Sequence, residues 1–384
     1  MGTSAPLAGV TILDAAQGIA GPWCAGLLGL QGARVIKVEP PSGDWGRGIG
    51  KTREGMNALT AAVNPGKESV VLDTSDDAGR KALARLAAGA DMVIESFRPG
   101  VSARIGLDPV ALRKANPALV FVSVSGFGAE GPYRNRPGTD TVIQAISGMM
   151  QMNRESDGIP RPIPMFAVDM LTGLHAAHLS LAALYRAKAT GEGAHVQVPL
   201  LDCAASFQAI HMLEEYVTAG APAVPPTVPS GVFPTADGYL RVTSVSEKTF
   251  AAICEALAKT EWLSDPDYAT LDARVRNADR LNALVGGIIA GDTTAAWLAK
   301  MEPAGVLCAP VNDYDALRAD RHAVETGLFQ KIEQPGLGPL PIPRPPGIAV
   351  PLSPAPRLGA DTDAVLADFG FDAEERAALR AAGA

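Results

Sequence analysis

The sequence predicts an α/β protein built on a parallel β-sheet, accompanied by a second, smaller domain. Two observations support this prediction. Short β-branched runs alternate with stretches of helical periodicity between residues 10 and 124. Strands separated by helices are joined by crossovers, which make the strands parallel and cover both faces of the sheet. The chain has 384 residues, of which 47% are apolar and 19% charged, so it is long enough to bury two cores and is not disordered.

Each predicted element of the large domain follows from a local pattern. Strands are expected at 10–13, 35–38, 70–72, 92–95 and 119–124, and helices at 23–30, 77–87 and 109–115. Residues 142–150 predict a helix that ends in a glycine. Residues 169–188 are apolar on most sides and predict a buried helix, with Asp169 at or near its N-cap and Gly191 beyond its end.

The second half of the chain predicts a smaller α+β domain. Residues 221–229 form a proline-rich linker, and Asp237-Gly238 is a turn signal that pairs 231–234 with 239–243 as a hairpin. Proline-rich residues 335–356 predict extended chain, and 362–369 a last helix before a polar tail. We therefore expect a large domain over 1–220, a small domain over 221–325 and a C-terminal segment over 326–384.

Charge and cysteine content narrow the class of partner. A net charge of −8 argues against nucleic acid. Four scattered cysteines, with no Cys-x-x-Cys pair, indicate neither a disulfide framework nor a zinc site and are typical of the reducing cytoplasm. No leader-like segment or apolar run of membrane-spanning length is evident. We expect a soluble, cytoplasmic protein without a membrane partner.

Common cofactor and hydrolase motifs do not match. The first strand–helix junction carries only Gly18 and Gly21, whereas a dinucleotide fold needs Gly-x-Gly-x-x-Gly. His175 and His178 lie three residues apart on the long helix without a third ligand nearby, so no metal is expected. Neither Gly-x-Ser-x-Gly nor His-Glu-x-x-His occurs.

Basic residues instead follow several predicted strands. Arg47, Lys67, Arg98 and Arg104 come near strand ends, with Phe97 beside Arg98. Ligands of open α/β sheets bind beyond the carboxyl ends of the strands. Arginine pairs with phosphate and an aromatic ring covers a flat base. Each residue alone is ordinarily a surface charge or core aromatic, but together they predict a crevice for a phosphate-bearing ligand.

Asp169 has two compatible interpretations. As an N-cap it would stabilise its helix by about 1 kcal/mol. As a nucleophile it would use a carboxylate that the helix N-terminus keeps ionised, and Gly173 would let a substrate approach closely. Position in the sequence does not decide between them.

Motifs spread along nearly the whole chain resemble the class III CoA-transferases, also called the formyl-CoA transferase or CaiB/BaiF family. The matching stretches are PLAGVTILD at 6–14, IAGP at 19–22, GARVIKVEPP at 32–41, NPGKESVVLD at 64–73, FRPG at 97–100, SGFGAEGP at 125–132, VDMLTG at 168–173, ATGEG at 189–193 and LGADTDAVL at 358–366. Each motif is weak alone, but their order is specific.

The resemblance implies a fold that periodicity did not predict. This is a Rossmann-like large domain completed by the C-terminal segment, a smaller α+β domain, and an interlinked homodimer. The catalytic aspartate of the family falls on Asp169. Its CoA contacts fall on Gln17, Leu72, Asp73, Ser96, Phe97, Arg98 and Arg104.

The implied activity is transfer of CoA from an acyl-CoA donor to a carboxylic acid acceptor. Asp169 would form a mixed anhydride and then an aspartyl-CoA thioester, with neither a metal nor a permanently bound cofactor. Backbone N–H groups of 126–128, or of the helix that Asp169 opens, would hold the oxyanion. Succinyl-CoA with a small dicarboxylate is the expected pair, with Arg134 and Arg136 as candidates for a distal carboxylate.

Two alternatives remain, together with departures from the family pattern. Related α-methylacyl-CoA racemases use a Gly-His-Asp triplet, which here is Gly138-Thr139-Asp140 and lacks the histidine. A non-catalytic CoA-binding protein is the other alternative. The glycine-rich run of many members corresponds to glycine-free 242–247, Ser96 stands where asparagine is frequent, and Asp361 where histidine is frequent.

Overall fold

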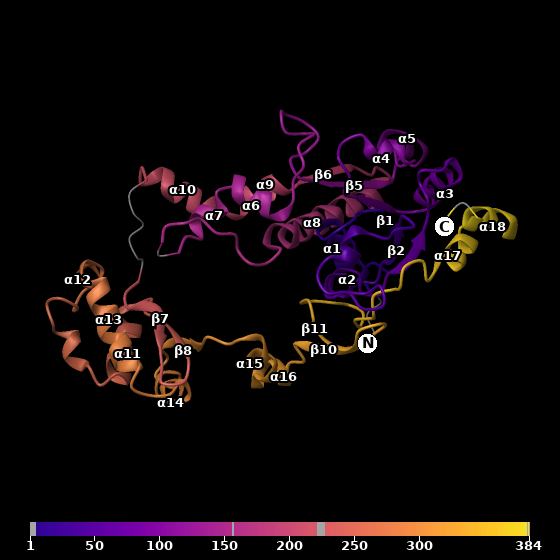
Figure 1. Ribbon diagram of the computed structural model, residues 1–384. Helices are drawn as coiled ribbons and strands as arrows, with labels where there is room; N and C mark the ends of the chain where they lie inside the picture. Colours follow the sequence, from indigo (N-terminus) through magenta and orange to yellow (C-terminus); the bar gives the residue numbers. More distant parts are fainter. Residues whose placement is uncertain (1–4, 156, 221–226, 382, 384) are drawn as a thin grey trace. The chain divides into compact units, whose positions relative to one another are not determined.

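The computed structural model of the chain describes residues 5–155, 157–220, 227–381 and 383 (Figure 1). These residues form two units, one of Met1–His211 with Gly327–Ala384 and the other of Met212–Thr326. The C-terminal segment thus belongs to the same unit as the N-terminal half. The predicted linker over 221–229 lies mostly outside the described residues.

A six-stranded sheet is the centre of the large unit. Its strand order is β3-β2-β1-β4-β5-β6 and every neighbouring pair is parallel, which confirms the predicted parallel sheet. The strands are β1 Thr11–Asp14, β2 Arg34–Glu39, β3 Glu68–Val71, β4 Met92–Glu95, β5 Val120–Ser125 and β6 His195–Pro199. β6 was not predicted, because this short edge strand is only partly buried. The direction of strand progression reverses between β1 and β4, where α/β sheets bind ligands.

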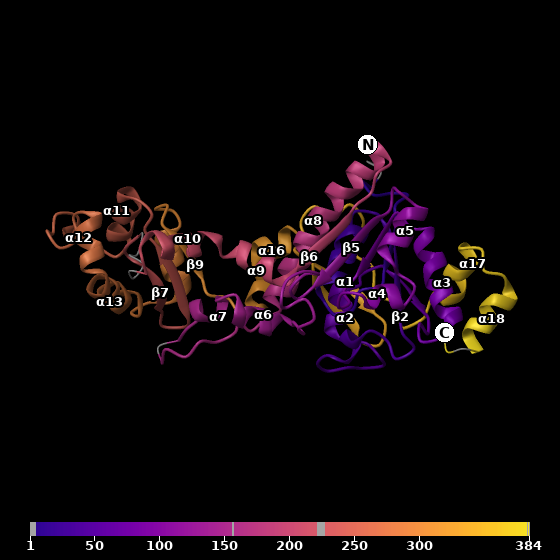
Figure 2. The same ribbon diagram turned by 90° about the horizontal axis from the view of Figure 1, so that it is seen from above.

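Both faces of this sheet are covered. Met92 and Ile94 of β4 pack in one core with α1 (Ala20–Gly29) and α8 (Ala167–Thr190), whereas Val93 packs in another with α3 (Asp77–Ala88). The C-terminal α17 (Thr362–Asp368) and α18 (Ala373–Ala381) join this second core beside α3 (Figures 1 and 2). The polar tail predicted after 362–369 forms a further helix, α18, whose Leu379 is buried in this core.

Shorter helices connect these elements. They are η1 Trp45–Gly48, α2 Ala58–Val63, α4 Val101–Arg104, α5 Pro109–Ala115, α6 Asp140–Ile146, α7 Met149–Met152, α9 Leu200–Phe207 and α10 Ala209–Val217. The single helix predicted over 142–150 is divided into α6 and α7, because Gly148 adopts a φ of 87° between them.

The smaller unit is an α+β structure with its own core. Its antiparallel strands are β7 Ser230–Pro234, β8 Tyr239–Thr243 and β9 Leu307–Pro310, and its helices are α11 Glu247–Ala256, η2 Thr260–Leu263, α12 Leu271–Arg276, α13 Ala278–Ile289, α14 Thr294–Met301, α15 Tyr314–Ala319 and α16 Arg321–Glu325. Pairing of β7 with β8 confirms the predicted hairpin. In the C-terminal segment, β10 (Phe329–Gln334) pairs with β11 (Gly338–Pro343). Part of the stretch 335–356, which was predicted to be extended chain, is therefore a paired β-strand.

Helix α8 is long and apolar enough to cross a membrane by length and composition alone. It packs against α1 and β5, and 44% of its most apolar window is buried inside the protein. One side of α8 is therefore packed inside the protein.

Candidate active site

A cavity of about 320 Å³ opens beyond the carboxyl ends of β1, β4 and β5. It is lined by the loops that follow these three strands, together with Trp45, Asp169 and Leu200. The cavity therefore lies at the switch point of the sheet, and its volume is that of a site for a small molecule.

Asp169 is the third residue of α8 and not its N-cap, which is Phe166. The capping carboxylate comes from α6. Asp140 accepts hydrogen bonds from the N–H groups of Val168 (2.8 Å) and Asp169 (3.0 Å), and it is held in turn by the Gln144 amide at 2.6 Å. The expected capping role of Asp169 is thus wrong, and its carboxylate lines the cavity instead.

The charge state of Asp169 also differs from the expectation. Burial, reinforced by the negative charge of Asp140, raises the pKa of the Asp169 carboxyl to about 7. Desolvation and repulsion therefore outweigh the helix N-terminus, which had been expected to keep this group ionised. This carboxyl is therefore harder to ionise than that of an ordinary aspartate.

Gly173 serves packing and not substrate approach. It is buried on the side of α8 that meets α1, where a Cβ atom would come within 2.7 Å of the Trp23 ring and 2.8 Å of the Ala20 carbonyl oxygen. The proposed role in admitting a substrate is therefore incorrect, because α1 occupies that space.

Four of the residues predicted to contact CoA line the cavity: Gln17, Ser96, Phe97 and Arg98. The Ser96 hydroxyl accepts a hydrogen bond from the Gln17 N–H at 2.8 Å and lies 3.1 Å from the Gln17 carbonyl oxygen, to which it donates. This contact ties the loop after β1 to the loop after β4. The Phe97 N–H donates to the buried Glu95 carboxylate at 2.7 Å.

Three other predicted contacts do not line this cavity. The Leu72 side chain is fully buried in the core, so only its main chain could meet a ligand. Asp73 is partly exposed, and Arg104 is exposed on α4.

Two of the basic residues expected in the crevice are instead buried in ion pairs inside the protein. Arg47 is buried against Glu39 at 2.6 Å, and Lys67 against Asp14 at 2.7 Å. Their prediction as phosphate ligands is wrong, because their place in the sequence does not reveal the buried acids opposite them.

Sequence patterns missed part of the lining. Trp45 lies over Gly18 and lines the cavity, whereas the sequence signal in this segment was assigned to Arg47. The capping role of Asp140 was missed too, although the residue stands in the triplet that distinguishes the racemases. Arg134 and Arg136 line the cavity from an exposed loop, and the Arg136 guanidinium lies 5.1 Å from the Tyr133 ring centroid.

Some of the candidate oxyanion donors are already engaged, whereas Gly126 and Phe127 of the predicted stretch 126–128 line the cavity. The Gly128 N–H donates to the Ser125 hydroxyl at 3.1 Å, and the first N–H groups of α8 donate to Asp140. By contrast, the first turn of α1 has no side-chain cap, and Ala20 and Gly21 line the cavity.

Within the described chain, no cluster of three or more His, Cys, Asp or Glu side chains is arranged to hold a metal ion. The described residues that line the cavity include Thr139 but no histidine. The acid–base pair of a racemase is therefore not assembled from these residues.

A parallel α/β sheet with a carboxylate in a cavity at its switch point defines an α/β protein with a small-molecule site. The family model described as CoA-transferase family III matches residues 7–362, and the chain belongs to this family. The protein is thus an enzyme whose substrates are a CoA thioester and an acid acceptor.

Several similar proteins are named for a CoA-transfer reaction. The chain is 33% identical to a succinate–glutarate CoA-transferase of Agrobacterium fabrum, over 95% of this chain and 96% of that protein. It is 33% identical to an acetyl-CoA:oxalate CoA-transferase of Acetobacter aceti, over 80% and 81% of the two chains. A crystal structure of a CaiB/BaiF family protein from Brucella suis superposes with a TM-score of 0.85 at 32% identity, covering 96% of this chain and 100% of the other.

Proposed function

We propose that this enzyme transfers CoA from succinyl-CoA to a small dicarboxylic acid, with Asp169 as the covalent carrier. One observation carries the proposal: the Asp169 carboxylate lines the same cavity as Gln17, Ser96, Phe97 and Arg98. The names of similar proteins, which include glutarate and oxalate as acids, support a dicarboxylate.

The proposed reaction proceeds through two covalent states of Asp169. Its carboxylate oxygen attacks the donor thioester carbon, the C–S bond breaks, and CoA leaves as a thiolate, giving a mixed anhydride. The thiolate attacks the aspartyl carbonyl carbon, breaking the anhydride C–O bond. This releases the donor carboxylate and leaves an aspartyl-CoA thioester. An acceptor carboxylate then reverses both steps, which restores Asp169 and yields the acceptor thioester.

The surroundings of Asp169 suit this chemistry. Each tetrahedral intermediate carries a negative oxygen, and the first turn of α1, at Ala20 and Gly21, provides backbone N–H groups at the positive end of a helix for it. The raised pKa of the Asp169 carboxyl makes the carboxylate a stronger nucleophile than an ordinary aspartate. Loss of the acyl group to water is limited when the filled cavity excludes solvent.

Arg134 and Arg136 are the proposed receptors for the distal carboxylate of the acceptor. Both line the cavity, and an arginine holds a carboxylate by two parallel hydrogen bonds. Replacing Arg136 by methionine should raise the KM for glutarate by about tenfold and leave the KM for butyrate within about twofold, because butyrate lacks the second charge. Equal effects on both acids would remove Arg136 from acceptor recognition, and Arg134→Met provides the matched comparison.

The reaction itself is tested by incubating the enzyme with succinyl-CoA and a panel of mono- and dicarboxylic acids, and by measuring each new acyl-CoA. A dicarboxyl-CoA product is expected. Formation of products from monocarboxylic acids alone would contradict the proposed acceptor. Exchange of an α-proton of a 2-methylacyl-CoA, without any acceptor acid, would favour the racemase alternative.

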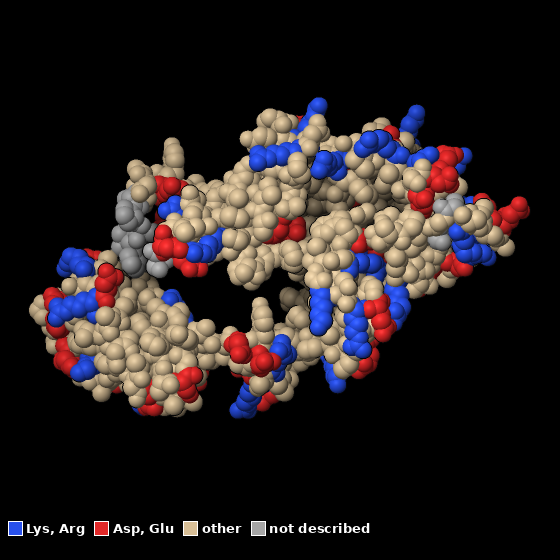
Figure 3. All heavy atoms as spheres, in the orientation of Figure 1, with Lys and Arg blue, Asp and Glu red and all other residues tan. Residues whose placement is uncertain are grey.

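A homodimer is also part of the proposal. Helix α8 carries an exposed apolar stripe of Leu174, Leu181 and Tyr185, which are 53%, 40% and 79% exposed. Exposed Val142, Ile146 and Phe207 add apolar area over α6 and α9, where the surface in Figure 3 is mostly uncharged. Water-exposed patches of this kind mark protein interfaces. Sedimentation should give twice the mass of one chain, and a monomer at micromolar concentration would contradict the proposal.

A further inference from the structure

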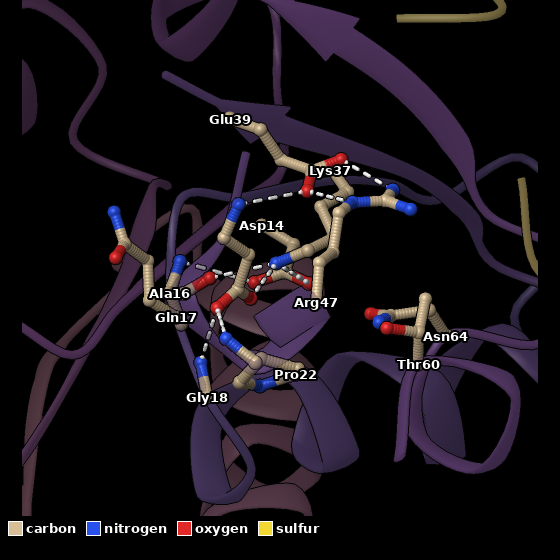
Figure 4. Close-up of polar contacts among 12 residues, drawn as sticks. Asp14, Ala16, Gln17, Gly18, Pro22, Lys37, Glu39, Arg47, Thr60 and Asn64 are labelled. Carbon is tan, nitrogen blue, oxygen red and sulfur yellow. Dashed lines mark hydrogen bonds and ion pairs between the residues drawn. The ribbon is translucent and has the colours of Figure 1, made fainter. Parts of the chain in front are cut away.

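A cluster of buried charges lies beneath the loop that follows β1. Asp14, Lys37, Asp44 and Lys67 are between 0% and 5% exposed. Lys37 is 2.8 Å from Asp44, and Lys67 is 2.7 Å from Asp14. Figure 4 shows Asp14 and Lys37 beside Ala16, Gln17 and Gly18 of this loop. Burying such pairs is costly and seldom adds stability over apolar side chains, so they are better explained by what they hold in place.

The Lys37–Asp44 pair holds the main chain on both sides of Gln17. The Lys37 ammonium donates to the Ala16 carbonyl oxygen at 2.8 Å, before Gln17. The Asp44 carboxylate accepts from the Gly18 N–H at 2.8 Å, after Gln17. Two charge-assisted hydrogen bonds thus fix the peptide groups that set the direction of the Gln17 side chain.

Other contacts complete this support. The Gln17 N–H and carbonyl oxygen are both bonded to the Ser96 hydroxyl. The Asp14 carboxylate accepts from the Ala16 N–H at 3.1 Å, and Lys67 donates to the Pro22 carbonyl oxygen at 2.7 Å, which extends the support into α1. Buried charges and the Ser96 hydroxyl thus both hold the main chain at Gln17. Gln17 itself lines the cavity together with Asp169.

The conformation of the next residue depends on the same support. Gly18 has a φ of 82°, and a Cβ atom there would lie 2.1 Å from the Trp45 ring. Asp44 is the N-cap of η1, the helix that carries Trp45. Its carboxylate also accepts a hydrogen bond from the Gly46 N–H at 2.8 Å. Asp44 therefore couples the loop after β1 to Trp45, whose ring lies against Gly18 in the cavity lining.

We propose that Lys37 and Asp44 are positioning residues that act through the main chain to aim the Gln17 amide at the acyl group being transferred. This inference rests on the proposed function, because it assigns Gln17 to the reacting substrate. Misplacing a substrate-contacting group by about 1 Å costs on the order of 100-fold in rate, so the pair should affect turnover more than binding.

A double-mutant cycle between Lys37→Met and Gln17→Ala tests the proposal. Lys37→Met alone should lower kcat by about 10- to 100-fold and change the KM for succinyl-CoA by less than about threefold. With Gln17→Ala already present, Lys37→Met should lower kcat by less than about threefold, because its effect passes through Gln17. Equal losses in both backgrounds, or an unchanged kcat in Lys37→Met, would overturn the inference.

Arg274→Met is the matched control for loss of a buried cation. Arg274 is 1% exposed and bonded to Glu247 in the smaller unit, outside the cavity lining. The Arg274→Met variant should have a lower melting temperature, as Lys37→Met should, but its kcat should stay within about twofold of the wild-type value. A kcat loss in this control as large as in Lys37→Met would assign the effect to stability and refute positioning.

Asp44 gives a second test should Lys37→Met not fold. Asparagine retains an oxygen for the Gly18 N–H and alanine does not, so Asp44→Asn should retain at least about tenfold more kcat than Asp44→Ala. Equal activities would overturn the inference. Amide exchange of a peptide covering 14–23 provides a readout that does not need turnover. If the wild-type enzyme transfers no CoA, the proposed function is refuted. If amide exchange of the 14–23 peptide is unchanged in Asp44→Ala, the positioning role of Asp44 is refuted.

Discussion

Replacing Asp169 by asparagine should stabilise the folded protein above neutral pH while abolishing transfer. The rise of the Asp169 pKa from 3.8 to about 7 corresponds to about 4 kcal/mol at about 1.4 kcal/mol per pH unit. Because this carboxylate is partly exposed, solvent screening reduces the expected gain in unfolding free energy to about 1–2 kcal/mol. The gain arises because the amide is neutral and escapes both desolvation and repulsion by Asp140.

The pH dependence distinguishes this explanation from better packing. Between the unfolded and folded pKa values, the folded protein holds a proton on Asp169 that the unfolded chain has released, so stability falls as pH rises through this window. Asparagine has no such loss. Urea unfolding should therefore show the full gain near about pH 8 and almost none near about pH 4. Exposed Asp202→Asn, in the first turn of α9, is the control. A gain independent of pH, or a loss at about pH 8, would refute the reasoning.

Three further outcomes are expected. In wild type, kcat/KM should rise with pH to a plateau, with a midpoint near the Asp169 pKa of about 7, because only the carboxylate attacks; a flat profile would contradict this. Asp140→Asn should lower that midpoint by removing the repelling charge, and an unchanged midpoint would exclude that charge as a cause. Gly173→Ala should lose about 1–3 kcal/mol of unfolding free energy in a urea titration, since its Cβ would contact Trp23, with the KM for succinyl-CoA unchanged; a raised KM instead would return Gly173 to the substrate site.

Alternating strand and helix patterns predicted the parallel sheet because strands buried on both faces have a strong local signal. The exceptions have weak signals. β6 is a half-exposed edge strand, and α18 is a largely polar helix whose burial depends on Leu379 meeting a core formed mainly by the N-terminal half. Such long-range contacts are not visible in a local window.

At the site, sequence located Asp169 and the strand-end residues but misjudged their environment. The capping carboxylate of α8 comes from Asp140, on a separate helix, so local spacing assigned the cap to Asp169 itself. Lys67 looked like a phosphate ligand because its partner Asp14 is distant in sequence. In both cases the partner is distant in sequence, and only the fold brings the two residues together.

The carrier role of Asp169 is tested most directly by chemical trapping. The enzyme is incubated with succinyl-CoA, quenched with hydroxylamine and digested, and the modified carboxylate is identified by mass spectrometry. A hydroxamate on Asp169, absent without acyl-CoA and absent from Asp169→Asn, is the predicted result. Labelling of another carboxylate, or full turnover with no trapped Asp169, would contradict the account.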